Sequence, residues 1–193
     1  MGQHQRQEWF GCACCPSNAA RFIPSLPQYI YAVKDNSLYI NLFNSNTVNV
    51  KVGKTAVTLS QQTGYPWNGD VTLKIEGGAG KYALNIRIPG WVKGEVVPSN
   101  LYTYADGKRL GYTVKVNGQE VTPNSQLSTL NSQLNKGYFV IDRQWKKGDK
   151  VEIHFDMEPR IVRANGLVAA DKGRVAIERA PIDHCAEWPD NQC

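Results

Sequence analysis

Apolar and polar residues alternate with a period of two along most of this chain. The pattern is clearest in six segments, at 38–43, 48–52, 71–76, 82–88, 112–116 and 151–157. In the last of these, Val151, Ile153 and Phe155 alternate with polar residues. Successive side chains of a strand point to opposite faces of a sheet, so the pattern predicts antiparallel strands with one buried and one solvated face.

Turn-forming residues fill the breaks between these segments. Asn117-Gly118 stands between two apolar residues and predicts a two-residue hairpin. Glycine and proline interrupt the chain at 64–69, 77–80 and 89–91. Many short strands at this spacing predict a sandwich or barrel and not a βαβ fold. The polar stretch 122–136, rich in Ser, Asn and Gln, predicts a long surface loop.

The segment that precedes the strands has a different character. Pro16 suits the first turn of a helix, and the Ala-Ala-Arg-Phe run at 19–22 continues one. Cys14 and Cys15 would then lie just before the N-terminus of that helix, where outward N–H groups favour anions. A thiol in such a place is more often a thiolate, which is the form that attacks electrophiles and binds metals.

Composition narrows the classes of partner. The 193 residues are 41% hydrophobic and 20% charged, which is typical of a folded globular chain. The net charge of +5 is spread among interspersed acidic residues, so we expect no nucleic-acid partner. No apolar run approaches the length of a membrane span, and residues 1–7 do not resemble a signal peptide. The compartment stays open, with bacterial cytoplasm or periplasm as the expected choices.

Five cysteines make an odd count, and three of them fall in the run Cys12-Ala13-Cys14-Cys15. Adjacent cysteines are poor disulfide partners for each other, so the set does not indicate a secreted disulfide framework. Metal ligation or a reactive thiol fits better. A closed zinc site that only holds the helix, with four protein ligands, is the structural alternative. Cys12 is expected to be a small buried residue without a chemical role.

Five motifs in the same order resemble glycoside hydrolase family 127, the β-L-arabinofuranosidase type. They are WFGCACCPSN at 9–18, YPWNG at 65–69, RIPGW at 87–91, VRAN at 162–165 and DKGRVA at 171–176. The resemblance implies a catalytic (α/α)6 barrel that is followed by β-sandwich domains. Residues 1–27 would be the end of the barrel, with the cysteine motif. Residues 28–193 would be an all-β, jelly-roll-like antiparallel β-sandwich, truncated at its C-terminus.

The resemblance also implies a chemistry. The family hydrolyses glycosides with retention, using a cysteine nucleophile held on Zn²⁺ and a glutamate of the barrel as acid/base. Cys14 matches the nucleophile, and Cys14 and Cys15 match zinc ligands. The other ligands and the acid/base would lie upstream. We therefore expect a parent enzyme that acts on arabinofuranosyl glycans, and an isolated chain that is inactive and holds zinc weakly or not at all.

Trp67 and Trp91 each lie in a loop with Pro and Gly. Either ring could stack on a sugar, but anchoring the core or the barrel junction is the favoured interpretation. Two alternatives to an enzyme part follow from these features. The chain could be a non-catalytic carbohydrate-binding or structural β-sandwich, or a zinc module that uses Cys12, Cys14 and Cys15. The fragment interpretation also predicts self-association through a barrel-facing surface that includes Trp9, Phe10, Phe22 and Ile23.

Overall fold

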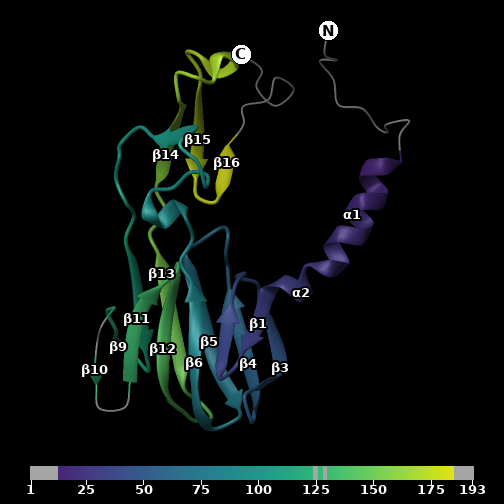
Figure 1. The fold of residues 1–193 in the computed structure, drawn as a ribbon, viewed down its shortest axis with the longest axis vertical. Helices are drawn as coiled ribbons and strands as arrows, with labels where there is room; N and C mark the ends of the chain where they lie inside the picture. The colour runs from purple at the N-terminus through teal and green to yellow at the C-terminus, as the bar shows by residue number, and fades with distance from the viewer. Residues whose placement is uncertain (1–12, 124–125, 128–129, 185–193) are drawn as a thin grey trace.

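Two large sheets packed face to face form the body of the molecule (Figure 1). The structure, a computed structural model, describes residues 13–123, 126–127 and 130–184. In order across the first sheet, the strands are β1 (Tyr31–Lys34), β2 (Ser37–Ile40), β6 (Gly80–Arg87), β12 (Tyr138–Trp145), β11 (Leu130–Asn135) and β10 (Gln126–Leu127). In the second they are β3 (Asn46–Val52), β4 (Thr55–Thr63), β5 (Asp70–Gly77), β13 (Lys150–Phe155), β8 (Tyr112–Val116) and β9 (Gln119–Glu120).

A smaller third sheet lies beyond one end of this sandwich (Figure 1). Its strands, in order, are β16 (Ile182–His184), β15 (Val175–Arg179), β14 (Pro159–Ala164) and β7 (Tyr102–Tyr104). Helices are few: α1 (Cys14–Ser25), α2 (Pro27–Ile30), and the short 3-10 turns η1 (Trp91–Lys93) and η2 (Ala169–Asp171). No helix in the described part of the chain is long and apolar enough to cross a membrane.

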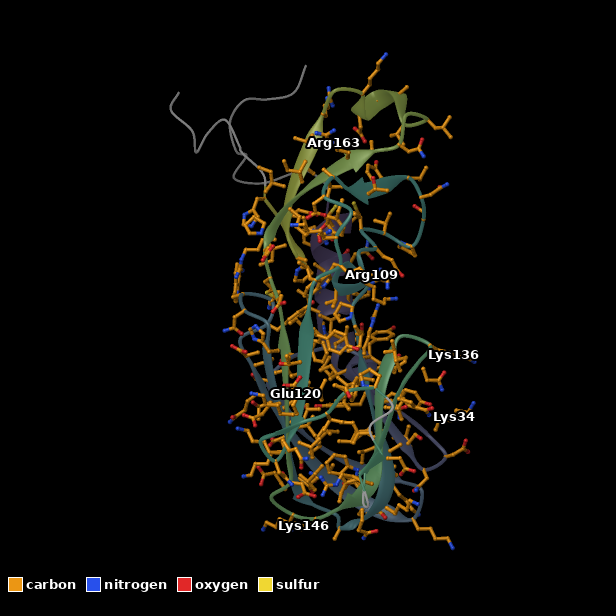
Figure 2. The ribbon with its side chains drawn as sticks, turned by 90° about the vertical axis from the view of Figure 1, so that its left-hand side faces the viewer. Lys34, Arg109, Glu120, Lys136, Lys146 and Arg163 are labelled. Atoms are coloured by element: carbon orange, nitrogen blue, oxygen red, sulfur yellow. The ribbon has the colours of Figure 1, made fainter. Side chains whose placement is uncertain are left out.

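The alternating residues build the core between the two large sheets. Leu84 and Ile86 of the first sheet and Ile153 of the second are at most 2% exposed. Aromatic rings join the layers, since Tyr112 of β8 meets Phe139 of β12 edge to face, with ring centroids 6.3 Å apart. Polar side chains point outward, and Figure 2 shows Lys34, Lys136 and Lys146 projecting from the body. The predicted all-β sandwich is confirmed.

Two features of the sheets differ from the sequence expectation. Strands β2 and β6 run parallel, in an otherwise antiparallel arrangement of the described strands. The predicted loop at 122–136 was wrong, because β10 and β11 lie within it and β11 pairs antiparallel with β12. Lys136 and Gly137 close that hairpin with φ of 48° and 84°, a two-residue turn that glycine favours. The predicted Asn117-Gly118 hairpin is confirmed, with φ of 52° and 82°.

An ion pair between the buried Arg160 and the exposed Asp106 ties the third sheet to the loop before β8. The Arg160 guanidinium donates to both carboxylate oxygens of Asp106, at 2.6 and 3.1 Å, and to the Lys108 carbonyl at 2.7 Å. It also lies 3.4 Å from the ring centroid of Tyr104, as a cation–π contact. The Tyr104 hydroxyl donates to Glu178 at 2.6 Å. This cluster fixes β14, β15 and β7 together.

The Asp106–Arg160 pair predicts a contribution to stability that disappears in acid. Hydrogen bonds from Arg160 lower the pKa of Asp106 from 3.8 to about 2. The contribution is therefore complete above pH 3.8 and is lost as the pH falls through 2. We expect wild-type unfolding free energy, measured by urea titration, to fall more steeply between pH 4 and pH 2 than that of Asp106→Asn. Parallel curves for the two proteins would contradict the assignment.

Candidate functional site

The two adjacent cysteines occupy the first turn of α1. The helix begins at Cys14, so both cysteines lie within it and not just before it as expected. The Ser17 N–H donates to the Ala13 carbonyl at 3.2 Å, which closes the first turn. Pro16 stands in this turn as predicted, where an N–H would have no helical partner. The Ser17 hydroxyl donates to the Cys14 carbonyl at 3.1 Å. Cys14 and Cys15 are thus part of the N-terminal turn, with the N–H groups of the helix end beside them.

Both thiols are exposed, and their sulfur atoms lie 3.8 Å apart. Two thiolates on one tetrahedral zinc, each about 2.3 Å from the metal, would be separated by about 3.8 Å. The pair therefore fits two of the four positions of a zinc site. In the described ranges no cluster of three His, Cys, Asp or Glu residues gathers that could complete it. Cys12 lies outside the described residues.

Helix α1 presents apolar side chains to solvent. None of its residues is buried, and Phe22 and Ile23 are 59% and 61% exposed. Leu26, between the two helices, and Tyr29, in α2, are exposed as well. Figure 1 shows α1 extending away from the sheets. Of the surface expected to face a barrel, Phe22 and Ile23 are exposed as predicted, whereas Trp9 and Phe10 lie outside the described residues.

The two loop tryptophans differ in burial. Trp91, in η1, is 7% exposed and packs edge to face on Phe155, with ring centroids 5.8 Å apart. That position agrees with the expected core anchor. Trp67 is 74% exposed, so it does not anchor the core of the sandwich, and its expected role at the barrel junction stays a prediction. Only its backbone is held, because Arg179 donates to the Trp67 carbonyl at 3.0 Å. Neither ring lies on the same segment as the cysteine pair.

A hollow of about 600 Å³ opens at the end of the sandwich from which α2 leaves. We call it the end pocket. It lies where β2 and β6 end and β12 begins, since Ile40, Ile86 and Tyr138 fall at that end of the paired strands. Its lining includes Phe43, Tyr65, Arg87, Trp91, Lys136 and Tyr138.

No local sequence pattern predicts this pocket, because its lining residues come from five separated segments. The signal that was present is indirect: two of the five family motifs, at 65–69 and 87–91, contribute Tyr65, Arg87 and Trp91. Loops that carry such motifs and meet at one end of a sandwich form the kind of concave surface that binds other groups.

Comparisons with known proteins agree on one family. A family model described as β-L-arabinofuranosidase, GH127 middle domain, matches residues 37–157. A second, described as the glycoside hydrolase family 127 C-terminal domain, matches residues 159–193. The boundary between the two models falls between β13 and β14, where the sandwich gives way to the third sheet.

Individual relatives are longer than this chain. A non-reducing end β-L-arabinofuranosidase of Bifidobacterium longum subsp. longum is 34% identical over 96% of this chain, which corresponds to 25% of that protein. A solved GH127 β-arabinofuranosidase is 56% identical, with a TM-score of 0.88 over 99% of this chain and 29% of its own. A GH127 β-L-arabinofuranosidase from Geobacillus stearothermophilus T6 gives 33% identity and a TM-score of 0.74, over 94% and 25%. The chain thus spans about a quarter of the length of these relatives.

Proposed function

The chain belongs to glycoside hydrolase family 127, and we propose that it supplies the C-terminal part of a retaining enzyme that cleaves β-L-arabinofuranosides. The observation that carries the proposal is the exposed pair of thiols at the first turn of α1, on a helix that has no buried residue. A nucleophile placed there faces away from the sandwich. It can therefore serve a substrate bound in a domain that packs on α1.

In this proposal the Cys14 sulfur attacks the anomeric carbon of the arabinofuranosyl unit. The bond to the leaving oxygen breaks, and a carboxylic acid of the preceding domain gives that oxygen its proton. Water, deprotonated by the same group, then displaces the sulfur, and two inversions give net retention. Nucleophilic catalysis of this kind needs the sulfur as a thiolate.

Cys14 and Cys15 would hold the zinc ion that the family resemblance implies. Their sulfur separation of 3.8 Å suits two thiolate ligands on one metal. Bound zinc supplies positive charge that keeps a coordinated thiol deprotonated. The remaining ligands would come from the preceding domain, so we expect the isolated chain to bind zinc weakly. The exposed apolar face of α1 would be covered by the same domain, and without it the chain is expected to self-associate.

An assay of the isolated chain tests whether hydrolysis requires the preceding domain. Because the acid that protonates the leaving group would lie in the preceding domain, we expect no turnover of a chromogenic β-L-arabinofuranoside above the buffer rate. The measurement is release of the chromophore at high protein concentration, with added zinc. Turnover that disappears in Cys14→Ala would show that this chain alone is sufficient, and would contradict the proposal.

A second candidate function, a non-catalytic carbohydrate-binding module, is favoured by the 74% exposure of Trp67. An exposed indole face suits stacking on a sugar ring. Calorimetric titration with arabinofuranosyl oligosaccharides separates the two. Saturable binding that Trp67→Ala abolishes would favour the module. The enzyme-part proposal predicts no such binding by the isolated chain.

A further inference from the structure

The end pocket contains a polar group that the described residues leave unsatisfied. The indole nitrogen of Trp91 is buried and has no hydrogen-bond partner among them. It lies near enough to Tyr65 to oppose the effect of burial on the pKa of that hydroxyl, without reaching hydrogen-bond geometry. Burial raises the Tyr65 pKa overall, so the phenol stays protonated and can donate. Buried polar groups are normally paired, so the Trp91 N–H points to a missing acceptor, to which the half-buried Tyr65 hydroxyl can also donate.

The positive charge at the pocket is only partly neutralised. Lys93 pairs with Glu95 at 3.1 Å, which neutralises that side. Arg87 and Lys136 have no carboxylate within ion-pair distance among the described residues. Two unpaired cations and two protein donors at one concavity favour an anionic acceptor. Phe43 and Tyr138 add apolar walls beside them.

The position of the pocket indicates where its occupant comes from. The Asn41 N–H donates to the Ile30 carbonyl at 2.8 Å, so a lining residue is bonded directly to the end of α2. Helix α1, whose apolar side chains are all uncovered, leaves from this same end (Figure 1). The third sheet lies beyond the same end, and Pro181, between β15 and β16, belongs to the lining. A domain that packs on α1 and reaches the pocket would therefore lie beside the third sheet.

We propose that the end pocket is the docking socket for a carboxylate-bearing segment of the preceding catalytic domain. The inference rests on the proposed function, since it takes that domain as the partner. The carboxylate binds Arg87, with Lys136 at the rim, and accepts from the Tyr65 and Trp91 donors. The socket thereby sets the position of the sandwich on the domain that α1 joins to it, and so the position of Cys14.

The test compares each variant in two settings. One is this isolated chain, and the other is a chimera in which it replaces the matching 29% of the 56%-identical GH127 enzyme. Arg87→Gln and Lys136→Ala remove charges from exposed side chains, so we expect the unfolding temperature of the isolated chain to change by less than about 1 °C. In the chimera we expect Arg87→Gln to lower the sandwich's unfolding temperature by roughly 2–4 °C. Lys115→Ala, on the outer face of β8, is the matched control and should change neither protein.

A second measurement tests the proposal without the chimera, in case the chimera does not fold. The catalytic portion of the same relative is titrated onto the isolated chain, and Arg87→Gln should weaken that association about tenfold at low salt, with the difference vanishing in 1 M NaCl. Equal effects of Arg87→Gln in both settings, or no association in trans, would overturn the socket. So would saturable binding of an acidic oligosaccharide in the pocket. An active chimera that is insensitive to Arg87→Gln would refute the socket alone and leave the proposed function standing.

Discussion

Trp145→Ala is expected to lower the free energy of unfolding by about 3–5 kcal/mol, the largest stability loss of any single substitution considered for this chain. The Trp145 side chain is completely buried. Its ring stacks on Tyr82 with centroids 6.2 Å apart, and its N–H donates to the Tyr82 carbonyl at 2.9 Å. Alanine would leave a cavity between the sheets and remove the indole hydrogen bond to the Tyr82 carbonyl. The measurement is urea denaturation followed by circular dichroism.

Trp67→Ala is the matched control, because it removes the same side chain from the surface. With 74% of Trp67 exposed, the loss should stay within about 0.5 kcal/mol. The hydrogen bond from Arg179 reaches the backbone of Trp67 and survives the change. A loss of comparable size in both variants would mean that the burial difference between the two positions does not hold in solution.

The strands of the sandwich were predictable because one face of each is buried. Alternation marks a strand only when its two faces meet different surroundings. Strand β11 shows where this fails. It lies near the edge of its sheet, and Leu134 within it is half exposed, so its sequence does not alternate and predicts a loop. The Lys136-Gly137 turn was the better signal. The parallel β2–β6 pair depends on a long-range pairing that no local pattern encodes.

The cysteine pair could be found from the sequence, and the end pocket could not. Cys14 and Cys15 are neighbours in the chain, and their chemistry follows from residue type and from the Pro16 helix start. The pocket exists only after β2, β6 and β12 have aligned their ends. Trp67 and Trp91 illustrate the limit. Both lie in Pro- and Gly-containing loops, yet one is exposed and the other buried, since burial depends on what folds over each loop.

The largest functional effect is expected at Cys14 in the chimera with the 56%-identical GH127 enzyme. If Cys14 is the nucleophile, the chimera hydrolyses a chromogenic β-L-arabinofuranoside, and Cys14→Ala lowers kcat/KM by at least about 10³-fold. The reason is that alanine has no atom that can attack the anomeric carbon. Thermal unfolding should change little, because the Cys14 side chain is exposed at the start of a helix without buried residues. Lost rate with intact folding therefore separates chemistry from stability.

Cys193→Ala removes a thiol elsewhere in the sequence and serves as the matched control. It should leave kcat/KM within about twofold of the unsubstituted chimera. Trapping with a mechanism-based inhibitor gives an independent readout, since mass spectrometry should find the sugar on the peptide that contains Cys14 and not on Cys193. Full activity in Cys14→Ala, or a label on a carboxylate of the partner domain, would assign the nucleophile to another residue. In that event the thiol pair at the start of α1 would act only as a metal ligand set, because its geometry suits zinc whether or not its sulfur attacks the sugar.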